Sequence, residues 1–145
     1  MIVVKTEANI GLRILACLID YLIIYGFTFT LIFTIGVSDG NGTYSLKGFP
    51  AFVPVLFWLF MTVILESAFG ATIGNSIAGL KAIPMSGRNI NLSFTQSLKR
   101  HLLDPLDMFF FGLVAIITIN NTEKNQRVGD LWADTIVVKT KDLKN

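Results

Sequence analysis

A carboxylate inside a long apolar run is the first feature of the sequence that could do chemistry. Asp20 is the single acidic or basic residue between positions 14 and 37, and Arg13 directly precedes that run. An ionisable group at membrane depth must be neutralised, hydrated or paired, and such groups commonly belong to proton or cation pathways. Arg13 lies seven residues before Asp20, which is two helical turns and nearly the same face. The spacing predicts that the two side chains form a coupled pair, either in direct contact or through water.

Two further acidic residues are candidates for the same proton or cation pathway. Glu66 lies near the end of a second apolar run at positions 49–69. If the two runs are antiparallel helices, Glu66 is a second candidate partner for Arg13. Asp107 lies at the start of a third apolar run. Asp20, Asp107 and Glu66 together define a candidate proton or cation path. The plain alternative is a buried ionic clasp that only fixes helix packing.

The sequence gives no comparable support for an enzyme activity. The chain contains one His and one Cys, and it has no phosphate-binding glycine loop and no serine nucleophile motif. Asp104 and Asp107 flank Pro105 in the manner of a helix start and are interpreted as helix-start residues, not as an acid and base pair. A net charge of +2 without a basic patch excludes nucleic acid as a partner. We expect no enzyme activity, no metal site and no cofactor.

The elements that must position these acids are apolar helices. At about 1.5 Å per residue, positions 10–37 and 49–69 are each long enough to cross a hydrocarbon core of about 30 Å. A third apolar helix is predicted over 105–120, with a length of about 24 Å. It either crosses the bilayer with local thinning or re-enters on the side from which it came.

An amphipathic helix is predicted between the second and third apolar runs. Ser93 and Gln96 have the spacing of a capping box, which marks the start of a helix after Ser93. We expect this helix at the membrane surface, with Lys99 and Arg100 directed toward the head groups. The β-prone run at 80–83 precedes it and predicts a short strand.

Two patterns leave alternatives open. Gly70 and Gly74 have the small-residue spacing of a helix-packing face, but glycines that serve backbone turns in a loop explain the same pattern. The pentapeptide at positions 2–6 recurs at 136–140. It predicts short flanking strands at both ends of the chain, which either pair with each other or match by chance.

Composition places the whole chain in the membrane class. Hydrophobic residues make up 52% and charged residues 15% of the 145 positions, and the mean hydropathy is +0.62. Residues 1–145 are therefore expected to form a single all-α membrane domain with the lipid bilayer as its partner. Basic residues precede the first span and lie between the second and third runs, which predicts a cytoplasmic N-terminus. Five basic residues in the tail favour a re-entrant third segment and a cytoplasmic C-terminus over a full crossing.

Three stretches resemble the RDD family, bacterial and archaeal membrane proteins named for one arginine and two aspartates. The motif Arg13-x-x-Ala16-x-x-Ile19-Asp20 resembles its first helix, and residues 71–80 and 129–138 resemble its two later segments. The resemblance assigns the second aspartate to Asp130 and implies that Arg13, Asp20 and Asp130 form one cluster. It also implies a place in the bacterial or archaeal cytoplasmic membrane. The family has no general biochemical activity.

The sequence departs from this family pattern at three positions. Asn75 stands where the family usually has lysine, Gly129 where it has histidine, and Asp134 where it has glycine. Any role of those three family side chains is therefore in question for this chain.

Three interpretations of function follow. The first is a multi-pass RDD-type membrane module without an assigned activity. The second is proton or cation transport, which a chain with two or three spans would perform as a homo-oligomer or with a larger membrane-protein partner. The third is a non-transporting accessory or scaffold subunit of a membrane complex, which would dock through Gly70 and Gly74.

Overall fold

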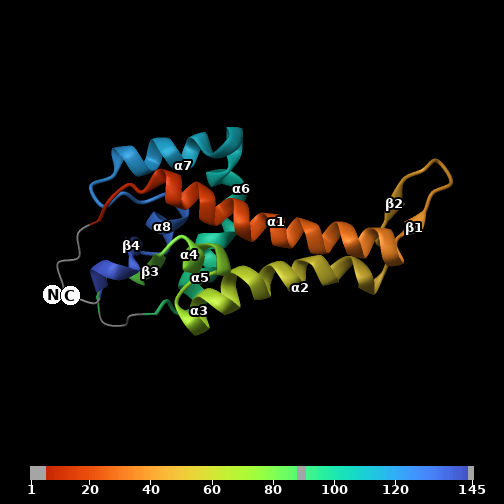
Figure 1. Cartoon of the computed structure of the whole chain (residues 1–145), viewed down its shortest axis with the longest axis horizontal. Coiled ribbons are helices and arrows are strands. Elements are labelled where there is room, and N and C mark those ends of the chain that lie inside the picture. Colours follow the sequence, from red (N-terminus) through yellow and green to blue (C-terminus); the bar gives the residue numbers. More distant parts are fainter. Residues whose placement is uncertain (1–5, 88–90, 144–145) are drawn as a thin grey trace.

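Two long antiparallel helical segments form the long axis of the molecule (Figure 1). The computed structural model describes residues 6–87 and 91–143. The first segment is α1, Ile10–Ile35, and the second runs over Phe49–Phe69. The second segment is assembled from η1 (Phe49–Phe52), α2 (Val53–Leu59), the π-helical turn η2 (Phe60–Ile64) and α3 (Leu65–Phe69). By length and composition both segments can cross a membrane, which confirms the first two predicted spans within two residues.

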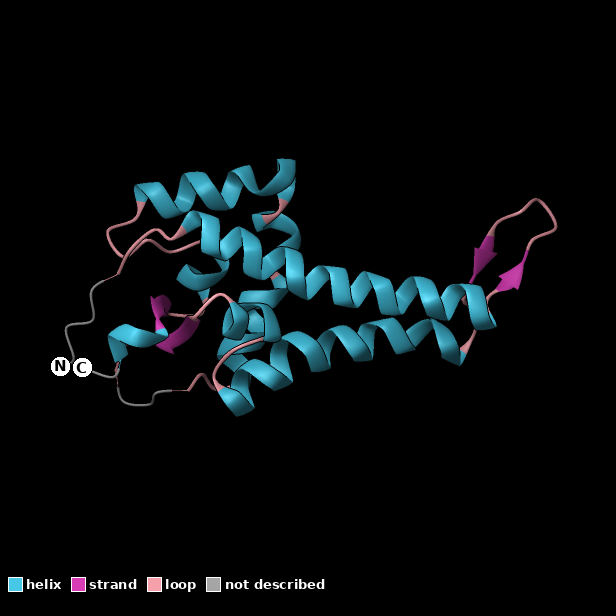
Figure 2. Cartoon of the chain, in the orientation of Figure 1, coloured by secondary structure: helices cyan, strands magenta, loops and turns pink. Residues whose placement is uncertain are grey.

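The strands lie at the two ends of the long axis (Figure 2). At one end, β1 (Val37–Ser38) and β2 (Tyr44–Ser45) form an antiparallel hairpin between the two long segments. We call this the hairpin end. At the other end, β3 (Leu80–Pro84) pairs antiparallel with β4 (Thr135–Lys139), with Ala82 opposite Val137. We call this the sheet end, and the start of α1 lies there.

The strand predictions at the sheet end are confirmed where the structure describes them. The run at 80–83 is in β3, and the run at 136–140 is in β4 and the first residue of η3 (Thr140–Leu143). Most of the matching run at 2–6 lies outside the described residues. Lys139 of β4 forms an ion pair with Glu7 at 2.5 Å, so the tail lies beside the start of α1.

The third apolar segment is not one helix over 105–120. The predicted capping box is present at the start of α5 (Phe94–Leu102), which is followed by α6 (Asp104–Asp107) and α7 (Phe109–Asn121). A bend of 117° separates the helical stretch 94–107 from α7. Positive φ angles at Phe110, Phe111 and Gly112 interrupt the helix there. After this interruption α7 runs back beside the first half of α1 toward the sheet end (Figure 1).

Short helices link these parts and carry the site. α4 (Ile73–Ile77) follows α3 and packs against α1, while α8 (Val128–Trp132) lies between α7 and β4. Gly70 ends α3 in a left-handed conformation with a φ of 86°. The interpretation of Gly70 as a turn residue is therefore correct, and the prediction that it belongs to a helix-packing face is wrong. Gly74 lies in α4, where it does permit a close approach to α1.

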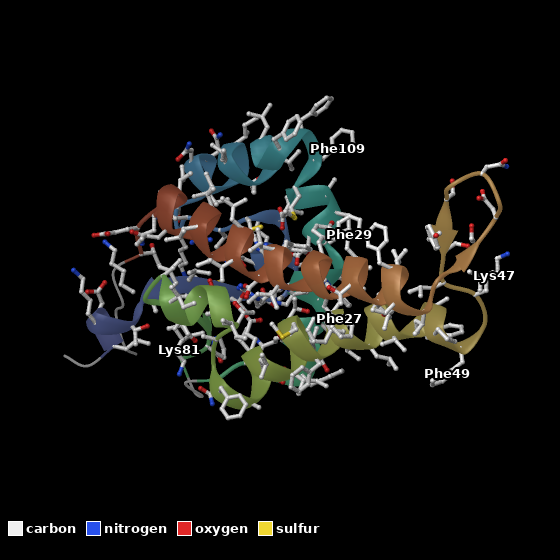
Figure 3. The ribbon with its side chains drawn as sticks, turned by 45° about the vertical axis from the view of Figure 1, so that its right-hand side comes forward. Phe27, Phe29, Lys47, Phe49, Lys81 and Phe109 are labelled. Atoms are coloured by element: carbon white, nitrogen blue, oxygen red, sulfur yellow. The ribbon has the colours of Figure 1, made fainter. Side chains whose placement is uncertain are left out.

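Many large apolar side chains are exposed, as expected for an all-α membrane protein, and the interior holds both apolar and charged side chains. Exposed phenylalanines such as Phe29, Phe49 and Phe109 lie along the outside, while Lys47 and Lys81 lie toward opposite ends (Figure 3). The predicted orientation of the amphipathic helix is wrong for Arg100. Arg100 is buried in α5 and faces the interior, because the lipid-facing side of such a helix is its apolar side.

Candidate functional site

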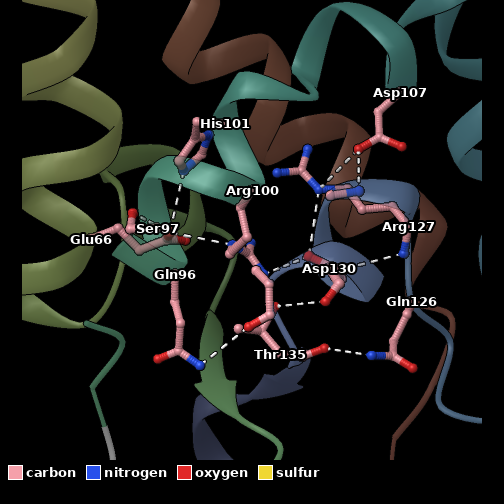
Figure 4. A network of polar contacts seen from close by, with 12 residues as sticks. Glu66, Gln96, Ser97, Arg100, His101, Asp107, Gln126, Arg127, Asp130 and Thr135 are labelled. Carbon is pink, nitrogen blue, oxygen red and sulfur yellow. Dashed lines mark hydrogen bonds and ion pairs between the residues drawn. The ribbon is translucent and has the colours of Figure 1, made fainter. Parts of the chain in front are cut away.

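A cluster of buried charged residues fills the space between α1, α3, α5, α6 and α8 (Figure 4). Around the cluster, α1 packs against α4, and α5 packs against α8. Five carboxylates, three guanidiniums and one imidazole meet there. They are Asp20, Glu66, Asp104, Asp107, Asp130, Arg13, Arg100, Arg127 and His101.

Asp130 is the centre of the cluster. Its side chain is fully buried in α8, and its Oδ1 lies 2.5 Å from Nη1 of Arg100 and 3.5 Å from Nε of Arg127. Nη1 of Arg13 lies 3.1 Å from its Oδ2. The structure therefore brings Arg13 and Asp130 together across 117 positions of sequence. One carboxylate joins the first helix to the last third of the chain.

The pKa of Asp130 follows from these neighbours. Burial alone would raise it, but the guanidiniums of Arg100, Arg127 and Arg13 outweigh burial and hold the pKa below its usual range. Burial likewise opposes the charge of Arg127, and the carboxylates of Asp104, Asp130 and Asp107 raise its pKa nonetheless. Both groups are charged in the folded state at neutral pH.

We therefore expect acid to weaken the fold through Asp130. A carboxylate whose pKa is lower in the folded state stabilises the fold above its unfolded pKa of about 3.9, and this stabilisation is lost as the pH falls through the folded value. Unfolding of the detergent-solubilised chain, followed by circular dichroism from pH 7 to pH 2, should show a loss of stability that starts near pH 4. The Asp130→Asn variant should show a smaller loss over that range. An equal loss in both proteins would contradict this role of Asp130.

Glu66 is bound on the other side of Arg100. Its Oε2 lies 3.3 Å from Nε of Arg100 and 3.3 Å from Nε2 of His101, and it accepts a hydrogen bond from Ser97 at 2.7 Å. Nδ1 of His101 lies 2.9 Å from Oδ2 of Asp104. Each ring nitrogen thus faces an ionised carboxylate that can only accept, so the imidazole carries both protons. The expectation that Glu66 is a partner of Arg13 is wrong, because α5 supplies its partners.

The acids of α6 do not cap their own helix as the sequence predicts. Asp104 accepts from the Tyr21 hydroxyl at 2.8 Å, and its Oδ1 lies 2.8 Å from Nη1 of Arg127. Asp107 accepts from the backbone N–H groups of Val128 and Gly129 at 3.0 and 3.1 Å. These two carboxylates tie α6 to the segment that begins α8.

Asp20 lies apart from these ion pairs. Its carboxylate accepts from the Thr72 hydroxyl at 2.6 Å and from the Gly74 N–H at 2.7 Å. Within residues 6–87 and 91–143, its contacts include no ion pair. The predicted direct contact with Arg13 is therefore wrong, because Arg13 donates to Asp130 and, at 2.7 Å, to the carbonyl of Asn125.

A cavity of about 70 Å³ lies between Asp20 and the ion pairs. It is large enough for a few water molecules, and its walls supply the polar partners that such waters need. Its polar lining includes Asp20, Tyr21, Thr62, Asn75, Arg13, Arg100, His101, Asp104 and Arg127. Glu66 and Asp107 do not line it. The cavity thus connects Asp20 to Asp104 and His101, two residues that the sequence did not single out for the path.

The fold and the cluster define a polytopic helical membrane domain with an ionic centre at one end. A family model described as RDD family matches residues 7–134, which is most of the chain, and the chain belongs to that family. The searches of curated proteins and of solved structures found no similar protein.

The structure gives physical reasons for two departures from the family pattern. At Gly129 a Cβ atom would lie 2.5 Å from the carbonyl oxygen of Arg100, so α5 approaches too closely for a side chain there. Asp134 has a φ of 53°, the left-handed conformation that glycine adopts readily and aspartate tolerates. At the third position, Asn75 takes part in the start of α4 through its backbone N–H, which donates to Thr72 at 3.1 Å.

Proposed function

We propose that this chain exchanges protons or monovalent cations at Asp20, as a homo-oligomer or together with a larger membrane-protein partner. One observation carries the proposal. Glu66, Asp104, Asp107 and Asp130 each pair with arginine or histidine among the described residues, whereas Asp20 is held by two neutral donors and lines a cavity that it shares with other polar side chains. A carboxylate without a fixed counter-cation is the one that can bind and release a proton or cation.

The cavity lies mainly on the sheet-end side of Asp20, where Arg13, Ala16 and Cys17 line it. Asp20 lies ten residues after the start of α1, about 15 Å along a helix of about 39 Å. Beyond it, Ile24 is buried and Phe27 stacks on Phe57 with the ring centroids 4.0 Å apart. One chain therefore offers a half-path, and the rest of the route requires another subunit.

The sheet end is proposed to face the cytoplasm. Lys81, Lys99, Lys139 and Lys141 are described at or near that end, while Lys47 is the basic residue of the hairpin segment between the two long helical segments. The positive-inside rule then places the N-terminus in the cytoplasm and the hairpin outside. The return of α7 toward the sheet end supports a re-entrant third segment, with the tail on the same side.

A flux assay in proteoliposomes tests the role of Asp20. Asparagine can still accept from the Gly74 N–H but cannot ionise, so Asp20→Asn should reduce proton-coupled or cation flux to the level of empty liposomes. Asp39→Asn is the matched control, because Asp39 lies in the exposed hairpin and caps backbone N–H groups of Asn41 and Thr43. The control should keep the wild-type flux under proton, sodium and potassium gradients.

Two outcomes would reject the exchange function. Asp20→Asn with wild-type flux would remove Asp20 from the path. Wild-type protein with no flux above empty liposomes, combined with a membrane protein that co-purifies at a fixed stoichiometry, would favour the accessory or scaffold subunit instead.

A further inference from the structure

A second and much larger cavity lies on the lipid-facing side, between α1 and α7. It has a volume of about 630 Å³ and a mostly apolar lining. On α1 its wall includes Ile10, Ile14 and Leu18, and on the returning segment it includes Met108, Ala115 and Ile119. We call it the α1–α7 groove.

The groove is long enough to extend through only part of one bilayer leaflet. Ile10 and Leu18 are separated by about 12 Å along α1, and the helical part of α7 after the bend, residues 113–121, is about 14 Å long. α7 therefore lies beside only the first half of α1. The groove starts near the sheet end and extends toward the membrane interior, where Phe111 at the bend is fully exposed.

Two arginines stand in the wall of this apolar groove. Arg13 and Arg127 both line it, and their side chains keep 12% and 18% of their surface exposed. Nε of Arg13 is buried without a hydrogen-bond partner in the described structure. A guanidinium has five donors, so each arginine can serve its carboxylates and still donate to a further acceptor.

One acid also stands in the groove wall. Asp107 is the groove's single carboxylate among the described lining residues; its oxygens accept from the backbone N–H groups of Val128 and Gly129, and its Oδ2 lies 3.6 Å from Nε of Arg127. The groove thus combines an apolar channel with two guanidiniums. The complementary ligand has an apolar chain and an anionic head.

We propose that the α1–α7 groove binds an anionic phospholipid, with one acyl chain between α1 and α7 and the phosphate at Arg13 and Arg127. Basic pockets between membrane helices bind anionic head groups in this way. The acyl chain covers apolar side chains of α1 that the short α7 leaves open. This binding does not require exchange at Asp20 and is measured without an ion gradient.

Photolabelling in vesicles tests the site without any mutation. The full-length chain is reconstituted with phosphatidylglycerol or phosphatidylcholine that carries the same diazirine-labelled acyl chain, and the labelled peptides are identified by mass spectrometry. Labelling by phosphatidylglycerol should concentrate on residues 10–18 and 108–119. It should exceed labelling by phosphatidylcholine by about fivefold for each arginine that the phosphate contacts.

A pair of tryptophan substitutions on α7 supplies the matched control. Ala115→Trp fills the groove and should abolish the phosphatidylglycerol label there, whereas Leu113→Trp places the same indole side chain at an exposed position outside the groove. Equal labelling by both lipids, or a wild-type label in Ala115→Trp, would overturn the proposal. Loss of a dimer in Ala115→Trp together with unchanged lipid labelling would assign the groove to a second copy and also overturn it.

Discussion

Replacing Asp130 by asparagine should destabilise the fold by about 3 to 5 kcal/mol, the usual effect of removing one partner from a buried ion pair. The asparagine amide is neutral, so Arg13 would lose its ion pair. Arg100 would still have the carboxylate of Glu66 as a partner. Arg127 would keep Asp104. The change leaves the Arg13 guanidinium without an ion pair in a largely buried site. It should appear as a lower free energy of unfolding in denaturant titrations of the detergent-solubilised chain.

Asp134→Asn is the matched control for that measurement. Asp134 is exposed and adopts a left-handed φ of 53°, which asparagine tolerates as well as aspartate does. The control should unfold within about 0.5 kcal/mol of the wild type, as surface substitutions usually do. If Asp130→Asn is no less stable than Asp134→Asn, the contacts of Asp130 do not stabilise the fold.

The long helices could be predicted from the sequence because the bilayer sets their length. An apolar run that must cross about 30 Å of hydrocarbon has few alternatives to a helix, so the bounds of the first two spans were predictable. The ionic partners were not, because ion pairs depend on which distant segments pack together. Arg13 and Asp20 share a helical face, yet Arg13 instead meets Asp130, and only the family resemblance pointed to that residue.

Arg100, His101 and Arg127 were missed for a related reason. Sequence rules developed for interfacial helices direct basic side chains toward water or head groups, whereas α5 directs Arg100 and His101 toward buried acids. One signal was available. His101 is the single histidine of the chain and follows Arg100 directly in a segment with exposed leucines. Two polar neighbours on the inner side of such a helix are typical of a membrane protein's interior.

The break in the third segment had a weaker signal. Gly112 has a φ of 86°, which glycine adopts readily, so a turn near this residue was predictable in principle. Phe110 and Phe111 also have positive φ angles, which bulky side chains rarely adopt. An apolar run of phenylalanines looks continuous in sequence, and apart from Gly112 nothing in its composition marks a bend.

A second large loss of stability is expected on substitution of Gly74, where α4 packs against α1. A Cβ atom at this position would overlap the carbonyl oxygen of Ala16 and lie 2.8 Å from Oδ2 of Asp20. The carbonyl belongs to the backbone of a long helix and cannot move alone. Gly74→Ala should therefore force α4 away from α1 and lower the free energy of unfolding by about 3 kcal/mol, the upper part of the range for overpacking.

Gly26→Ala provides the comparison for Gly74→Ala. Gly26 lies in α1 with no atom within 4 Å of an added Cβ, so the same substitution there should leave stability unchanged or raise it by up to about 1 kcal/mol through helix propensity. Displacement of α4 would also lengthen the hydrogen bond from the Gly74 N–H to Asp20. Gly74→Ala should accordingly impair both stability and the proposed flux, whereas Asp20→Asn should impair mainly the flux. Stability of Gly74→Ala equal to that of Gly26→Ala would show that the contact between α4 and α1 is looser than the structure has it.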